Sequence, residues 1–113
     1  MSSFDPMAIA IDWLDCYRAA DSSILDLYAP DAALECACDG AKTVIGRSAI
    51  SEYWRLRFSE NPAGELTGLH SEGDFVAVSY ETKGGVVQAL LQINEGKIVR
   101  SRCAPLESIL GIR

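Results

Sequence analysis

The sequence has a single histidine, His70, and no excess of basic residues. Its 10 lysines and arginines are outnumbered by 16 acidic residues, which gives a formal net charge of −6. A chain with this charge is a poor partner for the phosphate backbone of a nucleic acid. It also has no apolar run near the roughly 18 residues that a membrane span needs. We therefore expect neither a nucleic acid nor a membrane as a partner.

The sequence also lacks a basic leader. The N-terminal stretch MSSFDPMAIAIDW carries acids and no basic residue, unlike a secretory signal. Four cysteines in such a chain fit a reducing compartment better than a disulfide scaffold, so a cytoplasmic protein is expected. Because no repeat, low-complexity tract or linker interrupts it, the sequence predicts one domain over 1–113.

The first half of the sequence carries the signals of helices. Asp5-Pro6 predicts a helix start, with the acid as the cap and the proline in the first turn. Asp21 predicts the cap of a shorter helical piece, SSILDLYA, that Pro30 ends. A third helix is predicted from 47 to about 60. The buried face of the first helix is predicted from apolar residues at helical spacing, namely Ile9, Trp13, Cys16, Tyr17 and Ala20.

The second half changes to a period of two, which is typical of strands. It predicts strands near 65–72, 74–82, 86–94 and 97–104, and the earlier segments AALECAC and KTVIG predict a hairpin around Asp39-Gly40. Such short links require antiparallel neighbours. The whole pattern predicts an α+β fold, with about three helices in the N-terminal half packed on one face of a curved, mostly antiparallel sheet.

Three stretches together resemble the nuclear-transport-factor-2-like superfamily, in its SnoaL-like and ketosteroid-isomerase-like branches. They are YRAADSSILDLYAPDAALE, GRSAISEYW and GKIVRSRCAP, and the likeness covers roughly residues 8–105. The resemblance implies a cone-shaped half-barrel with a ligand pocket between helices and sheet. It also implies a small apolar or aromatic molecule as ligand, no cofactor, and a homodimer formed through the sheet face.

The chemistry of the ketosteroid isomerases does not carry over with this resemblance. Those enzymes use a tyrosine and a protonated aspartic acid as an oxyanion hole, and another Asp as general base. The corresponding positions here are Asp12, Ala89 and Cys36, and none of them matches. An alanine offers no donor to a developing enolate. Two classes of protein stay open: an acid–base enzyme of the isomerase, cyclase, dehydratase or hydrolase type, or a non-catalytic ligand-binding or dimerisation module.

The candidate catalytic residues are His70, Asp12 and Tyr80. Histidine is well suited to proton transfer near neutral pH, but the alternation along its strand leaves the face of His70 open. Asp12 lies at the edge of the charged stripe of the first helix, whereas the resemblance points it toward the pocket mouth. Tyr80 has the parity of Val76 and Val78, which the resemblance places on the concave side of the sheet, where its hydroxyl would orient a ligand.

The predicted pocket wall combines aromatic, small and sulfur-containing side chains. Aromatic residues at helical spacing are more often core than ligand contacts, but core and pocket wall are continuous in a cone-shaped fold. On the last strand, Ser101 and Cys103 are expected to face inward, and Arg100 and Arg102 outward. The wall residues are Trp13, Cys16, Tyr17, Cys36, Cys38, Trp54, Val78, Tyr80, Ala89, Ser101 and Cys103.

The closely spaced Cys36 and Cys38 admit several interpretations. A structural zinc site uses four ligands, usually in two close pairs, and Cys16 and Cys103 are far away in sequence, so no metal site is expected. A redox pair is more often C-x-x-C at a helix start. A nucleophilic cysteine needs a base, for which His70 is the only histidine. The favoured interpretation is that the cysteines are buried and act as small hydrophobic residues of the pocket wall.

Overall fold

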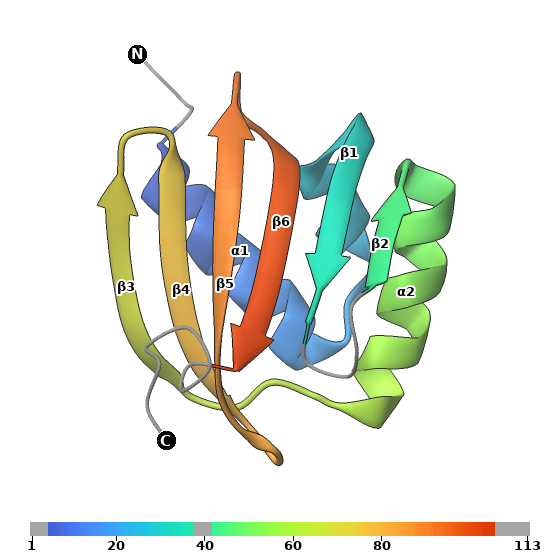
Figure 1. The fold of residues 1–113 in the computed structure, drawn as a ribbon, viewed down its shortest axis with the longest axis vertical. Coiled ribbons are helices and arrows are strands. Elements are labelled where there is room, and N and C mark those ends of the chain that lie inside the picture. The colour runs from blue at the N-terminus through green and yellow to red at the C-terminus, as the bar shows by residue number, and fades with distance from the viewer. Residues whose placement is uncertain (1–4, 38–41, 106–113) are drawn as a thin grey trace.

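The computed structural model describes residues 5–37 and 42–105 (Figure 1). Cys38 and the predicted turn at Asp39-Gly40 lie outside the described residues. The elements in chain order are α1 (Pro6–Ala19), the 3-10 helix η1 (Ser22–Leu27), β1 (Tyr28–Cys36), β2 (Lys42–Ile45), α2 (Arg47–Glu60), β3 (Leu66–Glu72), β4 (Phe75–Thr82), β5 (Gly85–Asn94) and β6 (Lys97–Pro105).

Local sequence signals place α1 where it was predicted. Asp5 caps this helix by accepting a hydrogen bond from the backbone N–H of Met7 at 3.1 Å, and Pro6 is the first helical residue. The helix ends at Ala19, and Ala20 follows it in a left-handed conformation with φ of 53°. Ala20 was predicted on the buried face of the helix, and this was wrong, because the residue lies beyond the helix end and is exposed.

The segment after Asp21 differs from its prediction at one end. Asp21 caps the helical piece as expected, but the piece is a 3-10 helix that ends at Leu27. Tyr28 already begins β1, so Pro30 lies within a strand and does not end a helix. Proline has no N–H to donate to a ladder. The strand accommodates it because the pairing of β1 with β6 is irregular between Tyr28 and Ala33.

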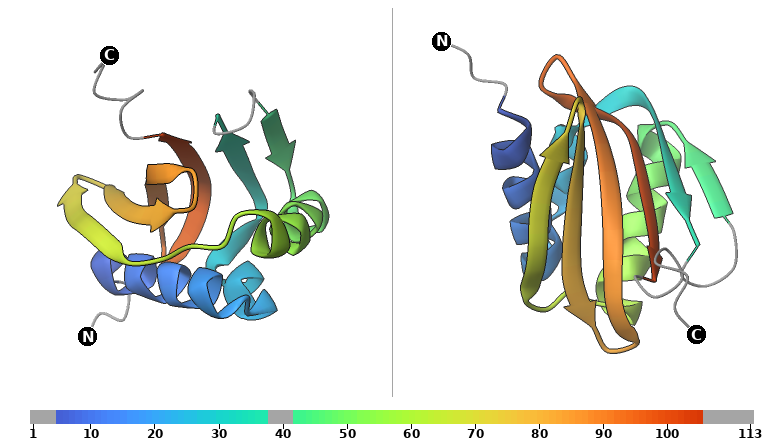
Figure 2. Two further views of the ribbon diagram at one scale, coloured as in Figure 1. Left: turned by 90° about the horizontal axis from the view of Figure 1, so that it is seen from below. Right: turned by 60° about the vertical axis from the view of Figure 1, so that its left-hand side comes forward.

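The six strands form one sheet in the order β2-β1-β6-β5-β4-β3. The meander from β3 to β6 is antiparallel throughout, as its short links predict, and the β1–β2 hairpin is antiparallel as well. β1 runs parallel to β6, a pairing that the sequence did not predict. Figures 1 and 2 show the sheet curving around the helices, which all lie on one side of it. We call this side the inner face and the opposite side the outer face.

Strand parity agrees with the predicted faces. Tyr80 is buried with Val76 and Val78 on the inner face. On β6, Ser101 and Cys103 are buried, whereas the side chains of the intervening arginines are exposed. Within the described part of the chain, no helix has both the length and the apolar character that crossing a membrane requires.

Candidate functional site

Four aromatic side chains fill the cone between the helices and the inner face. Trp13 and Tyr17 come from α1, Trp54 from α2 and Tyr80 from β4, and each is at most 3% exposed. Their rings pack edge to face, with centroids 4.8 Å apart for Tyr17 and Trp54 and 5.9 Å apart for Trp13 and Tyr80. Such pairs stabilise a core beyond the apolar area they bury. These predicted wall residues therefore contact one another.

The space that remains among these side chains is very small. Its volume is about 10 Å³, and Ala89, Ser101 and Cys103 of the predicted wall line it together with Trp54. A cavity needs roughly 10–15 Å³ to hold one water molecule. Among the described residues that line it, this part of the interior is a packed core, and the space between them has no room for a ligand the size of an aromatic ring.

A buried polar network crosses this core. The Tyr28 hydroxyl accepts a hydrogen bond from Trp13 Nε1 at 3.1 Å and lies 3.1 Å from Ser101 Oγ. Burial raises the pKa of Tyr28, and the hydrogen bonds with Ser101 and Trp13 offset part of this effect. Trp54 Nε1 is also buried; it has no partner at hydrogen-bond geometry among the described residues, but it lies near enough to Tyr28 to lower the pKa of that hydroxyl. The network therefore holds Tyr28 between α1 and β6, with the indole of Trp54 beside it.

A second polar cluster joins α2 to the ends of two strands. Arg57 of α2 is only 8% exposed, and its Nε donates to the Tyr17 hydroxyl at 2.8 Å. The hydroxyl of Tyr53, one turn earlier on α2, lies 3.9 Å from Cys103 Sγ. Cys36 of β1 is the register partner of Cys103 on β6. We call Cys36, Tyr53, Arg57 and Cys103 the thiol–phenol cluster.

The pKa values in this cluster favour a cationic guanidinium beside neutral phenols. Burial raises the pKa of Tyr53, and Cys103 raises it further while Arg57 lowers it. Burial lowers the pKa of Arg57, but the surrounding phenols and the Cys103 thiol outweigh burial, and the pKa is raised overall. A phenol with a raised pKa is fully protonated at neutral pH, so Tyr53 does not act as a general base there.

The three candidate catalytic residues do not converge on one place. His70 is exposed, and it lies on the outer face because it pairs with Ala77, whose strand neighbours face inward. Asp12 is exposed on α1, in agreement with its position in the charged stripe. Tyr80 is buried on the inner face. The structure therefore separates the only histidine from the interior of the cone.

The buried polar and charged residues of 5–37 and 42–105 are Arg57, Ser79 and Ser101. This part of the chain thus places no carboxylate and no imidazole in the interior. It also brings no three His, Cys, Asp or Glu side chains together as ligands of a metal ion. Arg57 was not predicted from the sequence, although this residue follows Tyr53 and Trp54 at helical spacing on the buried face of α2.

Cys16 of the predicted wall is half-buried and lies toward η1, with Sγ 3.7 Å from Ser23 Oγ.

A larger hollow lies outside the cone, between η1 and α2, and we call it the helix groove. Its volume is about 210 Å³, and Ile24 and Trp54 form its buried apolar floor. Arg55 stands at its rim, where it pairs with Glu52. The other lining residues are Ala20, Ser22, Leu25, Ser51 and Phe58.

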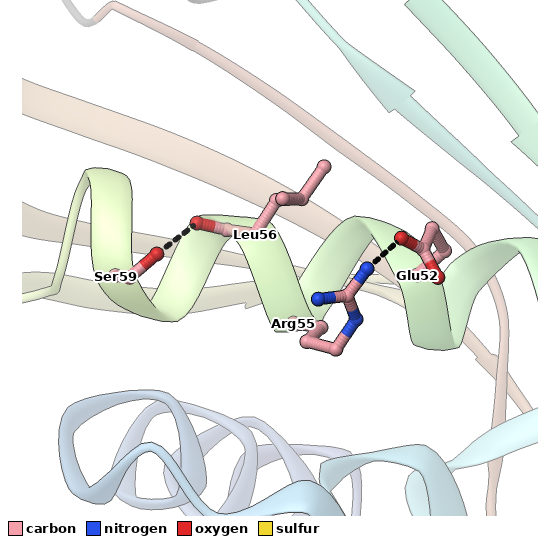
Figure 3. Close-up of polar contacts among 4 residues, drawn as sticks. All are labelled: Glu52, Arg55, Leu56 and Ser59. Atoms are coloured by element: carbon pink, nitrogen blue, oxygen red, sulfur yellow. Dashed lines mark hydrogen bonds and ion pairs between the residues drawn. The ribbon is translucent and has the colours of Figure 1, made fainter.

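Figure 3 shows the position of Arg55 and of its partner Glu52 on α2. Arg55 leaves the helix on the side that faces the N-terminal helices, and a dashed line joins it to Glu52. Leu56 leaves the helix on the opposite side, and its carbonyl accepts a hydrogen bond from Ser59 Oγ at 3.2 Å. One face of α2 therefore supplies both the apolar floor of the helix groove and its positive charge.

The shape of the molecule matches solved structures of one fold. A ketosteroid isomerase-like protein from Kribbella flavida superimposes with a TM-score of 0.77 at 19% identity, over 88% of this chain and 76% of that one. A SnoaL-like protein of unknown function from Burkholderia thailandensis superimposes with a TM-score of 0.75 at 17% identity, over 91% of this chain and 96% of that one. An NTF2-like protein of unknown function from Mesorhizobium loti superimposes with a TM-score of 0.71 at 19% identity, over 92% of this chain and 93% of that one.

These comparisons establish the fold. The chain has the curved, unclosed α+β fold of nuclear-transport-factor-2-like proteins, as in the SnoaL-like and ketosteroid isomerase-like structures. No family model and no curated protein matches the sequence. Because one fold hosts many activities, the function has to be argued from the site.

Proposed function

We propose that this protein is a non-catalytic binding module for a small apolar or aromatic molecule, which it holds in the helix groove. The observation that carries the proposal is the contrast between the two spaces, about 10 Å³ inside the cone and about 210 Å³ in the groove. An apolar cavity of ~150 Å³ accommodates benzene, whereas drug-sized ligands occupy roughly 300–1,000 Å³. The groove therefore suits a ligand of about one aromatic ring.

The chemistry of the lining narrows the ligand further. The floor of Ile24 and Trp54 offers apolar and aromatic contact, and Arg55 at the rim offers a positive charge that can pair with an anionic group. An aromatic carboxylate combines both features. Acid–base catalysis is the less favoured function, because His70 and Asp12 are exposed and lie away from the buried Tyr80.

A titration with phenylacetate and its neutral amide tests the binding proposal. Trp54 forms the floor and Trp13 does not, so phenylacetate is expected to change the fluorescence of the wild type and to leave that of Trp54→Phe unchanged. Arg55→Met is expected to weaken phenylacetate binding about two- to fivefold, the range for an exposed ion pair, and to spare the amide. Arg102→Met is the matched control, because both arginine side chains are 68% exposed. Equal losses in the two variants, or no binding to the wild type, would contradict the proposal.

We also propose that a second copy of the chain binds to the outer face of the sheet. No described helix covers this face, since all three lie on the opposite side (Figure 2). The side chains in the middle of this face are uncharged: Ala77 and Ser79 are small and buried, and Leu90 is half-buried. To one side, Glu35 accepts a hydrogen bond from Arg100 at 2.8 Å and forms an ion pair with Arg102 at 3.6 Å, so these charges are already compensated. Such a surface suits a self-complementary twofold contact.

A further inference from the structure

Two cysteines that are distant in sequence meet in the thiol–phenol cluster. Cys36 and Cys103 are register partners on β1 and β6, and both face the interior, with exposed fractions of 6% and 9%. Register partners on neighbouring strands point to the same side of the sheet. Both residues are thiols and neither is part of a disulfide. The fold thus creates a dithiol that the C-x-C spacing of the sequence does not reveal.

Tyr53 of α2 lies beside this dithiol. Its hydroxyl is 3.9 Å from Cys103 Sγ, and Cys36 is among the causes that raise the pKa of Tyr53. The two thiols therefore share one polar neighbour.

The spacing of the strands leaves room for an ion between the two sulfur atoms. Neighbouring strands lie about 4.7–4.9 Å apart, and register partners on them carry their side chains on the same side of the sheet. A metal ion between two thiolates, with metal–sulfur bonds of about 2.3 Å each, separates the sulfurs by up to about 4.6 Å. The ion bridges this spacing without moving β1 toward β6.

We propose that Cys36 and Cys103 form a two-coordinate site for a univalent thiophilic cation of the copper(I) class. Thiolate is a soft ligand and selects soft cations of this kind. Binding converts two S–H groups into two metal–sulfur bonds and releases two protons, without oxidation or reduction. The site does not depend on the helix groove or its ligand.

The charges around the site fit such a complex. Two thiolates and one univalent cation carry a net charge of −1, and the buried guanidinium of Arg57 lies in the same cluster. Cys103 raises the pKa of Arg57 through a Coulombic effect, which agrees with a guanidinium placed near this thiol. Tyr53 can donate a hydrogen bond from its hydroxyl to the Cys103 thiolate once the S–H proton has left. Both neighbours therefore stabilise the anionic, metal-bound form.

An anaerobic competition experiment tests the site. Copper(I) is supplied as its bicinchoninate complex to the reduced full chain, and the fall in the absorbance of that complex reports transfer to the protein. The wild type is expected to take up one equivalent, and Cys16→Ser to take up the same amount, because Cys16 lies toward η1. Cys36→Ser and Cys103→Ser are each expected to lose at least tenfold in affinity, since one sulfur ligand is gone. Undiminished uptake by Cys103→Ser would overturn the proposal.

Two further measurements keep the outcome decisive. Cys38→Ser is expected to retain copper, and loss of copper from this variant together with retention by Cys103→Ser would assign the site to the C-x-C pair and overturn pairing across β1 and β6. If a serine variant fails to fold by circular dichroism, X-ray absorption of the copper-loaded wild type replaces it. Two sulfur ligands are expected there, and three sulfurs or any nitrogen ligand would overturn the two-thiol site.

Discussion

Tyr28 connects α1 to β6 through a single hydroxyl group. The group accepts from Trp13 Nε1 and pairs with Ser101 Oγ, both at 3.1 Å, and all three residues are buried. A hydrogen bond contributes little to stability on balance, but a buried polar group that loses its partner costs about 1–3 kcal/mol. The stability of the core therefore depends on each partner in this network.

Tyr28→Phe is expected to lower the free energy of unfolding by about 1–3 kcal/mol, because it leaves the Trp13 N–H and the Ser101 hydroxyl buried without this partner. Urea titration followed by tryptophan fluorescence measures the change. Ser101→Ala provides the control, since the double variant should lose less than the sum of the two single losses. Additive losses would show that the two hydroxyls do not act as one network.

η1 is the element whose stability depends most directly on pH. Asp21 caps it by accepting the backbone N–H of Ser23 at 2.9 Å and the Ser23 hydroxyl at 2.8 Å. These hydrogen bonds lower the pKa of Asp21 below its ordinary value of 3.8. A group with a lowered pKa in the folded state contributes stability that is complete above its unfolded pKa. That contribution disappears as the pH falls through the folded pKa.

Asp21→Asn is expected to flatten the acid limb of the stability profile, because asparagine can still accept at the cap but does not titrate. Free energies of unfolding measured from neutral pH to below 3.8 should fall less steeply for this variant than for the wild type. Ser23→Ala removes one of the two donors and should give an intermediate slope. Parallel profiles for Asp21→Asn and the wild type would contradict the assignment.

The sequence predicted the elements whose signals are local. Asp5-Pro6 marks the start of α1, and the short links between β3 and β6 determine an antiparallel meander, so these parts could be derived from neighbouring residues. The prediction for Pro30 was wrong because it also used only neighbouring residues. Proline locally predicts the end of a helix, but Pro30 lies in β1, where an irregular pairing with β6 accommodates it. Tertiary pairing overrides a local signal in this segment.

The candidate site depended on non-local pairing and was less predictable. The alternation of side chains along the strands predicted inward positions for Tyr80, Ser101 and Cys103, and all three side chains are buried. It could not give the parallel contact of β1 with β6, because residues 37–96, about half of the chain, separate these strands. The meeting of Cys36 with Cys103 follows from that contact alone. How completely four aromatic rings fill the cone is likewise a matter of volume and packing, which periodicity does not encode.

At the scale of the whole molecule, the fold and the filled interior point to different uses. The fold is shared with ketosteroid isomerase-like and SnoaL-like structures, yet the interior of this chain contains packed aromatic rings and a buried arginine. Removing such rings costs several kcal/mol, so the aromatic cluster is better explained as the source of stability than as a chamber wall. Both surfaces that we propose for recognition, the helix groove and the outer face of the sheet, lie outside this packed interior.

Association through the outer face is expected to give a homodimer, with twice the mass of one chain by light scattering at micromolar concentration. Leu90 pairs with Ala77 on one side and Arg102 on the other, which places it in the middle of this face. Leu90→Glu puts two like charges close together across a twofold contact and should shift the protein to monomer. Leu56→Glu is the matched control, because Leu56 is an exposed leucine that belongs to α2 and not to a strand of the outer face, and its replacement should leave the dimer intact. A monomeric wild type would contradict the dimer itself, and a dimer that survives Leu90→Glu but dissociates in Leu56→Glu would place the contact elsewhere.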